Sequence, residues 1–297
     1  MARMPVISIV FFASLAGAYP VRAQSARDGG LLVTPQWLAQ HQRDRDLVIL
    51  QAGQPEGFRS GHIAGSQFVS LRTLSTPFQP GTLNLEMPPE ETLIDGLEQL
   101  GISDGSRIVV VFDSDWIPQA TRVVFTLAYI GLDQNTVLLD GGLRAWRQAG
   151  YPVTADSAPS TRGHISRHAI RSLIVDHAYV AALRNRPQVR LIDARGASSF
   201  SGPPREQELA GHIPGAASLP FETLFDGTNR LLPKAVLAEK FRAIGVQPGD
   251  TIVGYCHVGL YATAMLFAAR VLGHPVRLYD GSFQDWSMRK LPTEGGT

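Results

Sequence analysis

The one cysteine of the chain, Cys256, lies where a buried strand is expected to give way to a helix. The apolar run 252–255 predicts the strand, and the small and apolar residues over 262–272 predict the helix, which Gly273 should end. A side chain at this junction faces the unpaired N–H groups and the partial positive charge of the first helical turn. Because both favour thiolate over thiol, we expect Cys256 to have a lowered pKa and to act as a nucleophile.

The residues that follow the cysteine are expected to complete an anion-binding loop. Gly259 tolerates the unusual backbone angles that a ring of inward-pointing amides requires. With Cys256 as the catalytic residue, the predicted binding residues of the loop are His257, Val258, Gly259, Leu260, Tyr261 and Ala262. The alternative is a cysteine that only packs, because free cysteine is among the most buried residue types.

The composition limits what the protein can bind. Its 297 residues carry 27 Lys and Arg against 26 Asp and Glu, a net charge of +1, which predicts no nucleic-acid partner. The eight histidines show no metal-ligand spacing, and a single cysteine forms neither a thiolate cluster nor an internal disulfide. We therefore predict no metal and no cofactor.

The first residues follow the pattern of a secretory signal peptide. A basic start at Arg3 precedes an apolar stretch over 6–18, and Val21 and Ala23 stand at the two positions that a signal peptidase reads. We predict that residues 1–23 are cleaved off and that the protein is exported to the periplasm. An uncleaved N-terminal anchor is the alternative, although the apolar stretch is short for a span. No run in the mature chain reaches the length that a bilayer requires.

The chain consists of two similar halves. Residues 61–66 match 211–216, and 139–146 match 279–286, with further landmarks in the same order. We place the first domain at 30–152, a linker containing Pro, Ser and Gly at 153–169, and the second domain at 170–291. Each copy alternates short apolar strands with amphipathic helical segments. This order predicts an α/β protein with two tandem domains, each a parallel sheet with helices on both faces.

The two copies differ at their reactive positions. The first copy has Phe112 or Asp113 where the second has Cys256, and Gln51 and Gly53 where it has Asp193 and Arg195. The apolar frame persists while these residues change together. We therefore expect the first copy to be a catalytically silent scaffold. Its longer segment 113–119 could pack over the cleft of the second copy, and an insertion at 201–209 occurs only in the second.

Taken together, these landmarks resemble the tandem-domain rhodanese family of sulfurtransferases. The resemblance is carried by the Cys-x-x-Gly-x-x-Ala loop at 256–262, by Asp193-Ala-Arg195, and by the segments 211–216 and 280–286. It implies a catalytic C-terminal domain, a persulfide on Cys256 and a cleft between the domains. It also implies a small anionic sulfur donor, such as thiosulfate or 3-mercaptopyruvate, and a thiol or cyanide acceptor.

The chain departs from the family pattern where the donor anion should bind. Thiosulfate-specific members have basic residues directly after the cysteine and mercaptopyruvate-specific members have small ones, whereas this loop has His257 and Val258. The family's second arginine, a turn beyond Asp-x-Arg, is Ser199 here. Arg195 binds the donor or forms a structural ion pair with Asp193. The other candidate cations are His257, Arg205, Arg230 and Lys234.

Other polar side chains near the loop also have two interpretations. His257 supplies positive charge at mildly acid pH or points to solvent. Tyr261 donates its hydroxyl to the anion or packs against the first domain, and packing is favoured. His62 and His212 occur in both copies, so we expect them to fix turns by hydrogen bonding rather than to catalyse.

Two other functions compete with sulfur transfer. A cysteine phosphatase or arsenate reductase needs an arginine six residues after the cysteine to clamp its oxyanion, and that position is Ala262. A persulfide carrier or thiol-sensing module, delivering sulfur to a partner protein, has the same loop and stays open.

Overall fold

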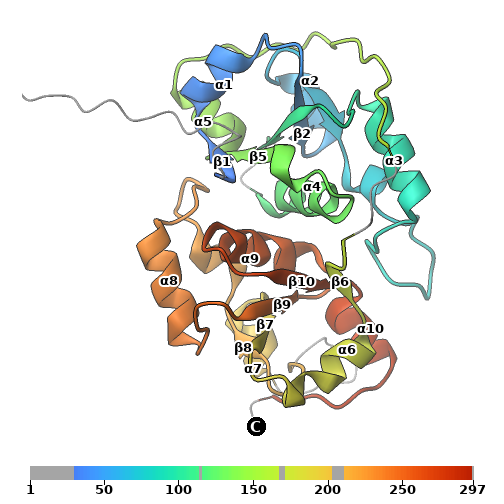
Figure 1. The fold of residues 1–297 in the computed structure, drawn as a ribbon, viewed down its shortest axis with the longest axis vertical. Helices are drawn as coiled ribbons and strands as arrows, with labels where there is room; N and C mark the ends of the chain where they lie inside the picture. Colours follow the sequence, from blue (N-terminus) through green and yellow to red (C-terminus); the bar gives the residue numbers. More distant parts are fainter. Residues whose placement is uncertain (1–29, 114–115, 167–170, 203–210, 296–297) are drawn as a thin grey trace, which may run out of the picture.

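The computed structural model describes residues 30–113, 116–166, 171–202 and 211–295, so the predicted signal peptide lies outside the described residues. The described chain forms two domains, each with a five-stranded sheet (Figure 1). The strand order is β1-β5-β4-β2-β3 in the first domain and β6-β10-β9-β7-β8 in the second. Every pairing within the two sheets is parallel, and the second order repeats the first. The predicted duplication and the predicted α/β class are confirmed.

The strands and α-helices of the two domains correspond one to one along the chain. In the first domain the strands are β1 (Leu32–Val33), β2 (Leu47–Ala52), β3 (Gln67–Val69), β4 (Arg107–Phe112) and β5 (Thr136–Leu139). Its α-helices are α1 (Pro35–His41), α2 (Pro55–Ser60), α3 (Glu90–Gln99), α4 (Pro118–Tyr129) and α5 (Gly142–Gln148), with short 3-10 helices η1 (Leu71–Leu74) and η2 (Asp133–Asn135).

In the second domain the strands are β6 (Ile174–Val175), β7 (Val189–Asp193), β8 (Ala217–Ser218), β9 (Thr251–Tyr255) and β10 (Val276–Tyr279). Its α-helices are α6 (His177–Ala181), α7 (Ala197–Ser201), α8 (Lys234–Ala243), α9 (Leu260–Val271) and α10 (Ser282–Met288), with 3-10 helices η3 (Ala182–Asn185) and η4 (Phe221–Leu224).

Helices cover both faces of each sheet because successive strand residues point to opposite sides. In β4, Val109 and Val111 pack with Trp37 of α1 and Trp146 of α5. The alternate residues of β4, Ile108 and Val110 among them, pack on the other side with α3 and α4. Since both faces are buried, the strands are apolar throughout rather than alternating.

The two domains meet through α4 and α9, which lie against each other across the boundary (Figure 1). Both helices are buried almost all round, and one hydrophobic core runs through both domains. The two helices therefore lie inside a core that the domains share. At the centre, the hydroxyls of Thr121 and Thr263 are 3.0 Å apart, and each threonine is the fourth residue of its helix.

Residues 153–166 of the predicted linker run over the outside of the first domain (Figure 1). The backbones of Thr154 and His62 exchange two hydrogen bonds of 2.8 Å, and the N–H of Gly163 donates to the carbonyl of Glu98 at 2.8 Å. The linker is therefore held by main-chain bonds along this domain.

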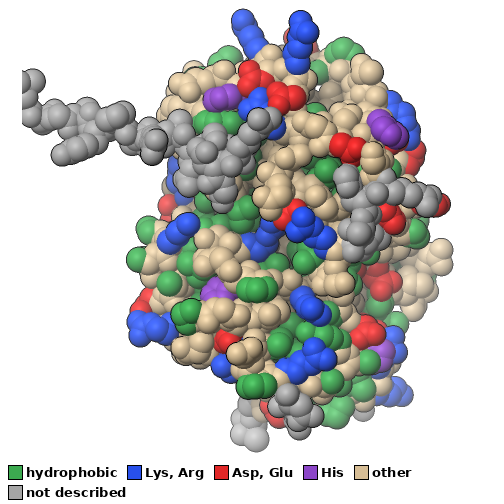
Figure 2. Space-filling view, in the orientation of Figure 1, with side chains coloured by type: hydrophobic (Ala, Val, Ile, Leu, Met, Phe, Trp, Pro, Cys, Tyr) green, Lys and Arg blue, Asp and Glu red, His purple; other side chains and the backbone are tan. Residues whose placement is uncertain are grey.

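Basic and acidic side chains alternate over the face of the molecule shown in Figure 2. This mixture agrees with the net charge of +1. Within the described part of the chain, no helix combines the length and the apolar character that crossing a membrane requires.

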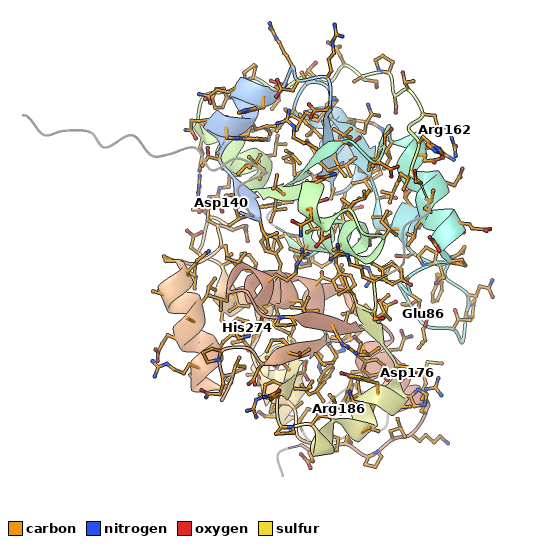
Figure 3. The ribbon with its side chains drawn as sticks, in the orientation of Figure 1. Glu86, Asp140, Arg162, Asp176, Arg186 and His274 are labelled. Carbon is orange, nitrogen blue, oxygen red and sulfur yellow. The ribbon has the colours of Figure 1, made fainter. Side chains whose placement is uncertain are left out.

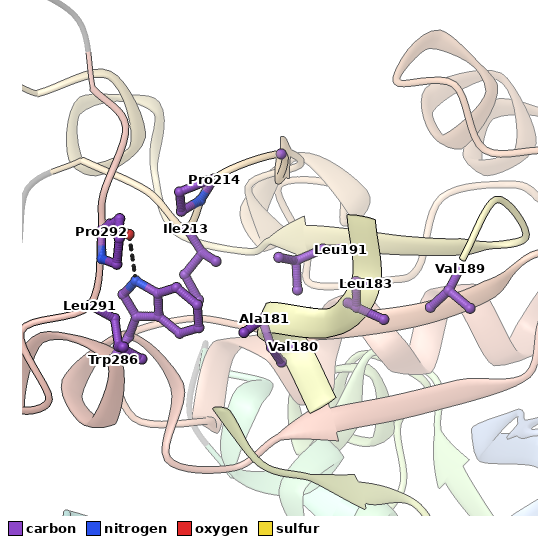
Figure 4. A pocket seen from close by; sticks show the side chains of 11 residues that line it. Val180, Ala181, Leu183, Val189, Leu191, Ile213, Pro214, Trp286, Leu291 and Pro292 are labelled. Carbon is purple, nitrogen blue, oxygen red and sulfur yellow. Dashed lines mark hydrogen bonds between the residues drawn. The ribbon is translucent and has the colours of Figure 1, made fainter. Parts of the chain in front are cut away.

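An apolar pocket of about 380 Å³ opens on the outer side of the second domain, lined by Val180, Leu191, Ile213, Trp286 and Leu291 among others (Figure 4). In the first domain the same region is filled by aromatic rings. The backbone N–H of Trp37 donates to the helix cap Thr34, and the residue is 2 % exposed. The ring of Tyr151 lies 4.7 Å from that of Trp146.

The second domain lacks both of these rings. Tyr179 takes the place of Trp37, bonding to its own cap Asp176, but its ring lies outside this pocket under Arg186 and Arg277. Leu291 takes the place of Tyr151, before a proline whose carbonyl accepts from the tryptophan indole in both copies. The pocket is the space that these two exchanges leave.

Restoring one ring should stabilise the second domain. We expect Leu291→Tyr to raise the free energy of unfolding by about 0.5–2 kcal/mol, because the new ring fills space beside Trp286. Urea unfolding followed by circular dichroism measures the change. The control is Val236→Tyr on the exposed side of α8, which should leave stability within about 0.5 kcal/mol. A destabilised Leu291→Tyr protein would show that the pocket cannot accept the ring.

Candidate functional site

The cysteine loop connects the end of β9 to the start of α9, as the sequence predicts. Gly259 has a φ of +76° and caps the helix, which begins at Leu260, two residues before the predicted start. The helix ends at the expected position, with Gly273 at a φ of +91° after its last turn. The glycine turn therefore places the first turn of α9 directly after the cysteine.

Main-chain donors converge on the sulfur of Cys256. The backbone N–H groups of Val258, Tyr261 and Ala262 bond to it and favour its anionic form. The cysteine's own N–H donates to the hydroxyl of Ser282 at 3.1 Å, and its carbonyl accepts from Phe283 at 2.9 Å. The predicted cradle of amides is present, and the turn after β10 fixes the cysteine backbone from the other side.

The predicted lowering of the Cys256 pKa is wrong. The side chain is 1 % exposed, and this burial raises the pKa of the thiol above its ordinary value, with a smaller contribution in the same direction from Asp193. The three amides act against the burial but do not offset it. The sequence reveals the amides and the helix end but not the depth of the sulfur, and desolvation disfavours a charged form.

His257 does not supply the positive charge that one interpretation of the sequence gave it. Burial lowers its pKa, and the neighbouring charge of Arg195 lowers it further. The ring is neither fully exposed nor fully buried, and its Nδ1 is enclosed without a hydrogen-bond partner. The imidazole next to Cys256 is therefore neutral at pH 7.

Arg195 lies at the site, but its guanidinium is engaged by the protein itself. It bonds to both carboxylate oxygens of Asp193, with the shortest distance at 2.6 Å, and it also donates to the carbonyl of Gly211. The group sits 4.1 Å from the ring centre of Phe283 and is 1 % exposed. This geometry agrees with the structural interpretation of Arg195, because a buried charge needs such partners.

The other candidate cations lie in different surroundings. Arg230 reaches across the domain boundary and pairs with Asp140 at 3.0 Å. Lys234 is exposed at the first position of α8. Arg205 and most of the insertion 201–209 lie outside the described residues.

Aromatic side chains form a wall beside the loop. The ring of Tyr261 packs edge-on against Trp116 of the first domain at 5.9 Å and against Phe221 at 4.8 Å. Packing of Tyr261, the favoured interpretation of the sequence, agrees with these contacts. Trp116 comes from the longer segment 113–119 of the first copy, which thus reaches the catalytic loop of the second.

The matching region of the first copy holds an acidic side chain. A Cβ atom on Gly53 would lie 1.9 Å from the carboxylate of Asp113. The glycine that stands in place of Arg195 therefore leaves the room that Asp113 fills. A carboxylate at this position has no nucleophilic sulfur to offer, which fits a silent first copy.

The paired histidines have the same surroundings in both copies. The ring of His62 stacks on Phe58 at 3.8 Å, and that of His212 stacks on Phe200 at 3.7 Å. In each case Nδ1 contacts the carbonyl of the same phenylalanine. These contacts are those of a turn-fixing group.

Ser282, Asp280 and Arg122 contact the loop or its support but were not predicted as site residues, although Asp280 and Ser282 lie in the segment 280–286 that carries the family resemblance. Ser282 takes the place of Gly142 in the first copy, and both have a left-handed backbone, with φ values of +53° and +56°. The exchange of glycine for serine at a strained position was a visible signal. Arg122 carries no such signal, because its partner Asp280 is 158 residues away in sequence. Within the described residues, no group of three or more His, Cys, Asp or Glu is arranged to hold a metal.

Comparison with known proteins finds one domain family twice along the chain. The rhodanese-like domain matches residues 34–149 and 176–289. A probable 3-mercaptopyruvate sulfurtransferase of Pseudomonas aeruginosa is 32 % identical, over 86 % of this chain and 94 % of its own length. A thiosulfate sulfurtransferase of Gallus gallus is 28 % identical, over 89 % of this chain and 96 % of its own.

Solved structures share the fold. SseA of Escherichia coli, described as a 3-mercaptopyruvate sulfotransferase with the rhodanese fold, superposes with a TM-score of 0.75 at 26 % identity, covering 85 % of this chain and 98 % of SseA. An anaerobic ergothioneine biosynthesis enzyme of Chlorobium limicola superposes with a TM-score of 0.80 at 21 % identity, covering 91 % of this chain and 71 % of that one. The latter likeness concerns the fold alone.

The raised pKa of Cys256 gives a direct test. Since burial favours the neutral thiol, we expect the thiolate to form at a higher pH in the folded protein than in the urea-unfolded chain, whose cysteine titrates near the ordinary value of about 8.5. Ultraviolet absorbance of the thiolate measures this, with Cys256→Ser as the blank, and the single cysteine leaves no other sulfur to titrate. A folded-state midpoint below that of the unfolded chain would show that the amides outweigh the burial.

Proposed function

Because the chain belongs to the rhodanese-like family, we propose that it is a sulfurtransferase that moves a sulfane sulfur through a persulfide on Cys256. The convergence of three backbone N–H groups on that sulfur is the observation that carries the proposal. Donors arranged in advance around a point where negative charge gathers stabilise it without reorganisation. The names of the relatives agree, since they are thiosulfate and 3-mercaptopyruvate sulfurtransferases.

The first half-reaction transfers sulfur to the enzyme. Cys256 loses its proton, and its thiolate attacks the outer sulfur of the donor to form a sulfur–sulfur bond. With thiosulfate the existing sulfur–sulfur bond breaks, and sulfite leaves with the electron pair. With 3-mercaptopyruvate the carbon–sulfur bond breaks, and pyruvate leaves after taking up a proton. The cysteine persulfide anion that remains can be held by the N–H groups of Val258, Tyr261 and Ala262.

The second half-reaction restores the enzyme. A thiol or cyanide attacks the terminal sulfur, and the bond to Cys256 breaks with the electron pair returning to the cysteine. The same amides stabilise the returning thiolate, so one set of donors serves both steps. Covalent storage between two substrates predicts ping-pong kinetics.

The charges around the loop favour a donor of low charge. Arg195 is neutralised by Asp193, Arg122 by Asp280 and Arg230 by Asp140. The lowered pKa of His257 keeps its ring uncharged at neutral pH. Among the described residues that we considered as donor-binding cations, only the exposed Lys234 lacks an acidic partner. We therefore place 3-mercaptopyruvate, a monocarboxylate, ahead of the thiosulfate dianion.

The burial of the sulfur also bears on the carrier alternative. A persulfide handed to a partner protein has to be reached by that protein's own sulfur. Cys256 is 1 % exposed and stands beside the wall of Trp116, Tyr261 and Phe221. This surrounding favours small donors and acceptors.

Loading of the cysteine is the primary test. Incubating the mature protein with 3-mercaptopyruvate or thiosulfate should increase its intact mass by one sulfur atom, and cyanide should remove that sulfur. Cys256→Ser should gain nothing. We expect 3-mercaptopyruvate to give the higher kcat/KM when cyanide is the acceptor. An unmodified mass with both donors would contradict sulfur transfer through this residue.

We further propose that the protein is exported to the periplasm after cleavage of residues 1–23. The basic start, the apolar stretch and the small residues before position 24 support this. Expression of the full chain in a Gram-negative bacterium should give a mature protein that begins at Gln24 and is recovered in the periplasmic fraction. A full-length mass in the cytoplasmic fraction would contradict export.

A further inference from the structure

The catalytic loop packs against an acidic side chain that follows β10. A Cβ atom built on Gly259 would lie 2.7 Å from the carbonyl oxygen of Asp280 and 3.1 Å from its Oδ1. The first distance is shorter than real Cβ atoms allow, and Gly259 also has a left-handed φ of +76°, so glycine lets the loop lie this close to the aspartate. The position of Gly259 in the cradle therefore depends on where Asp280 is held.

Asp280 is held by the first domain. Its Oδ1 accepts from Nη1 of Arg122 at 2.7 Å, and its Oδ2 accepts from the backbone N–H of Met87 at 2.7 Å. The side chain of Asp280 is 8 % exposed and that of Arg122 is 1 % exposed. A buried ion pair with a second donor on the free oxygen has little freedom to move.

Arg122 is itself fixed by a strained turn of the first domain. Its Nη2 donates to the carbonyl of Leu85 at 2.6 Å, and Leu85 has a left-handed backbone with a φ of +58°. One residue earlier, the N–H of Asn84 donates to the side chain of Gln284 at 2.9 Å. The segment 84–87 and α4 thus both bond to the turn after β10 and the start of α10.

The turn after β10 is also hydrogen-bonded to the backbone of Cys256. Two residues after Asp280, the hydroxyl of Ser282 accepts the N–H of Cys256 and donates to the carbonyl of Tyr279 at 2.8 Å. A chain of contacts therefore runs from Arg122 through Asp280 and the turn 280–283 to both Gly259 and Cys256.

We propose that Arg122 is a positioning residue for the catalytic loop, through which the silent first domain holds the amide cradle in its anion-binding shape. The inference rests on the proposed role of Cys256, but its first test needs no turnover.

The charged and titratable groups around the sulfur set the signs of the test. They are Asp193 at the end of β7, Arg195 after it, His257 in the loop and Tyr261 in the first turn of α9, with Arg122 of α4 and Asp280 after β10 beside Gly259. Removing the guanidinium leaves Asp280 uncompensated and less firmly held, and both effects disfavour the thiolate. Removing the negative charge instead leaves a buried cation near the loop, which favours the thiolate.

The first domain offers a matched control. Asp140 follows β5 as Asp280 follows β10, and it also forms an ion pair across the domain boundary, with Arg230 at 3.0 Å. Figure 3 shows Asp140 on the first domain close to the second. This pair belongs to the turn of the silent copy, and Asp140→Asn breaks a cross-domain ion pair without touching the cysteine loop.

The experiment compares Arg122→Met, Asp280→Asn, their double variant and Asp140→Asn in the full mature chain. Thiolate absorbance gives the Cys256 midpoint, and stopped-flow loading with 3-mercaptopyruvate gives the rate of sulfur uptake. We expect Arg122→Met to raise the midpoint by about one pH unit and to slow loading at least about tenfold at pH 7.5. Asp280→Asn should give a lower midpoint than Arg122→Met, the double variant a value between them, and Asp140→Asn the wild-type value.

A Cys256 midpoint for Arg122→Met that matches that of Asp140→Asn, together with the loading rate of the wild type, would overturn the inference, because Arg122 would then act on the stability of the interface alone. If Arg122→Met does not fold, Arg122→Lys decides. It keeps the charge but cannot reach Asp280 and the carbonyl of Leu85 together, so slower loading supports the inference and wild-type loading overturns it. If wild type fails to load while Arg122→Met still shifts the midpoint, sulfur transfer fails and the positioning role stands.

Discussion

Two opposing effects set the pKa of Cys256: burial raises it, and backbone N–H groups that bond to the sulfur lower it. Taking Cys256 out of water disfavours its charge, and three amides of the loop restore part of the loss. The same burial makes those amides effective, because a hydrogen bond to an anion strengthens where water is excluded. Burial therefore keeps the Cys256 thiol neutral at rest. The three amides stabilise negative charge on the sulfur when a reaction places it there.

Duplication of the fold has allowed the two copies to take different tasks. Both keep the sheet order, the stacked histidine and the tryptophan that bonds to a following proline carbonyl. The first copy lacks a cysteine but supplies Trp116 to the aromatic wall beside the loop and Arg122 to the turn that supports it. Its side chains contact the second copy at several places.

The sequence predicted those features that depend on short-range pattern. Apolar runs, the glycine at the helix start and repeated landmarks gave the strands, the cysteine turn and the doubled α/β fold. The direction of the Cys256 pKa shift was wrong because the depth of a side chain depends on helices packed from two domains. Arg122 and Asp280 escaped for a related reason: a contact between residues 158 positions apart leaves no local trace. Arg195 gives a third example. The sequence Asp193-Ala-Arg195 does not tell whether the guanidinium binds a ligand or, as the structure shows, the carboxylate of Asp193.

The almost complete burial of α4 and α9 has a consequence for how the halves stay together. Separating the domains would expose two helices that are buried on nearly every side, together with the hydroxyl pair of Thr121 and Thr263. The linker is therefore not needed to keep the two domains associated. A cut in the exposed stretch around Pro159 would leave the two halves joined by their shared core.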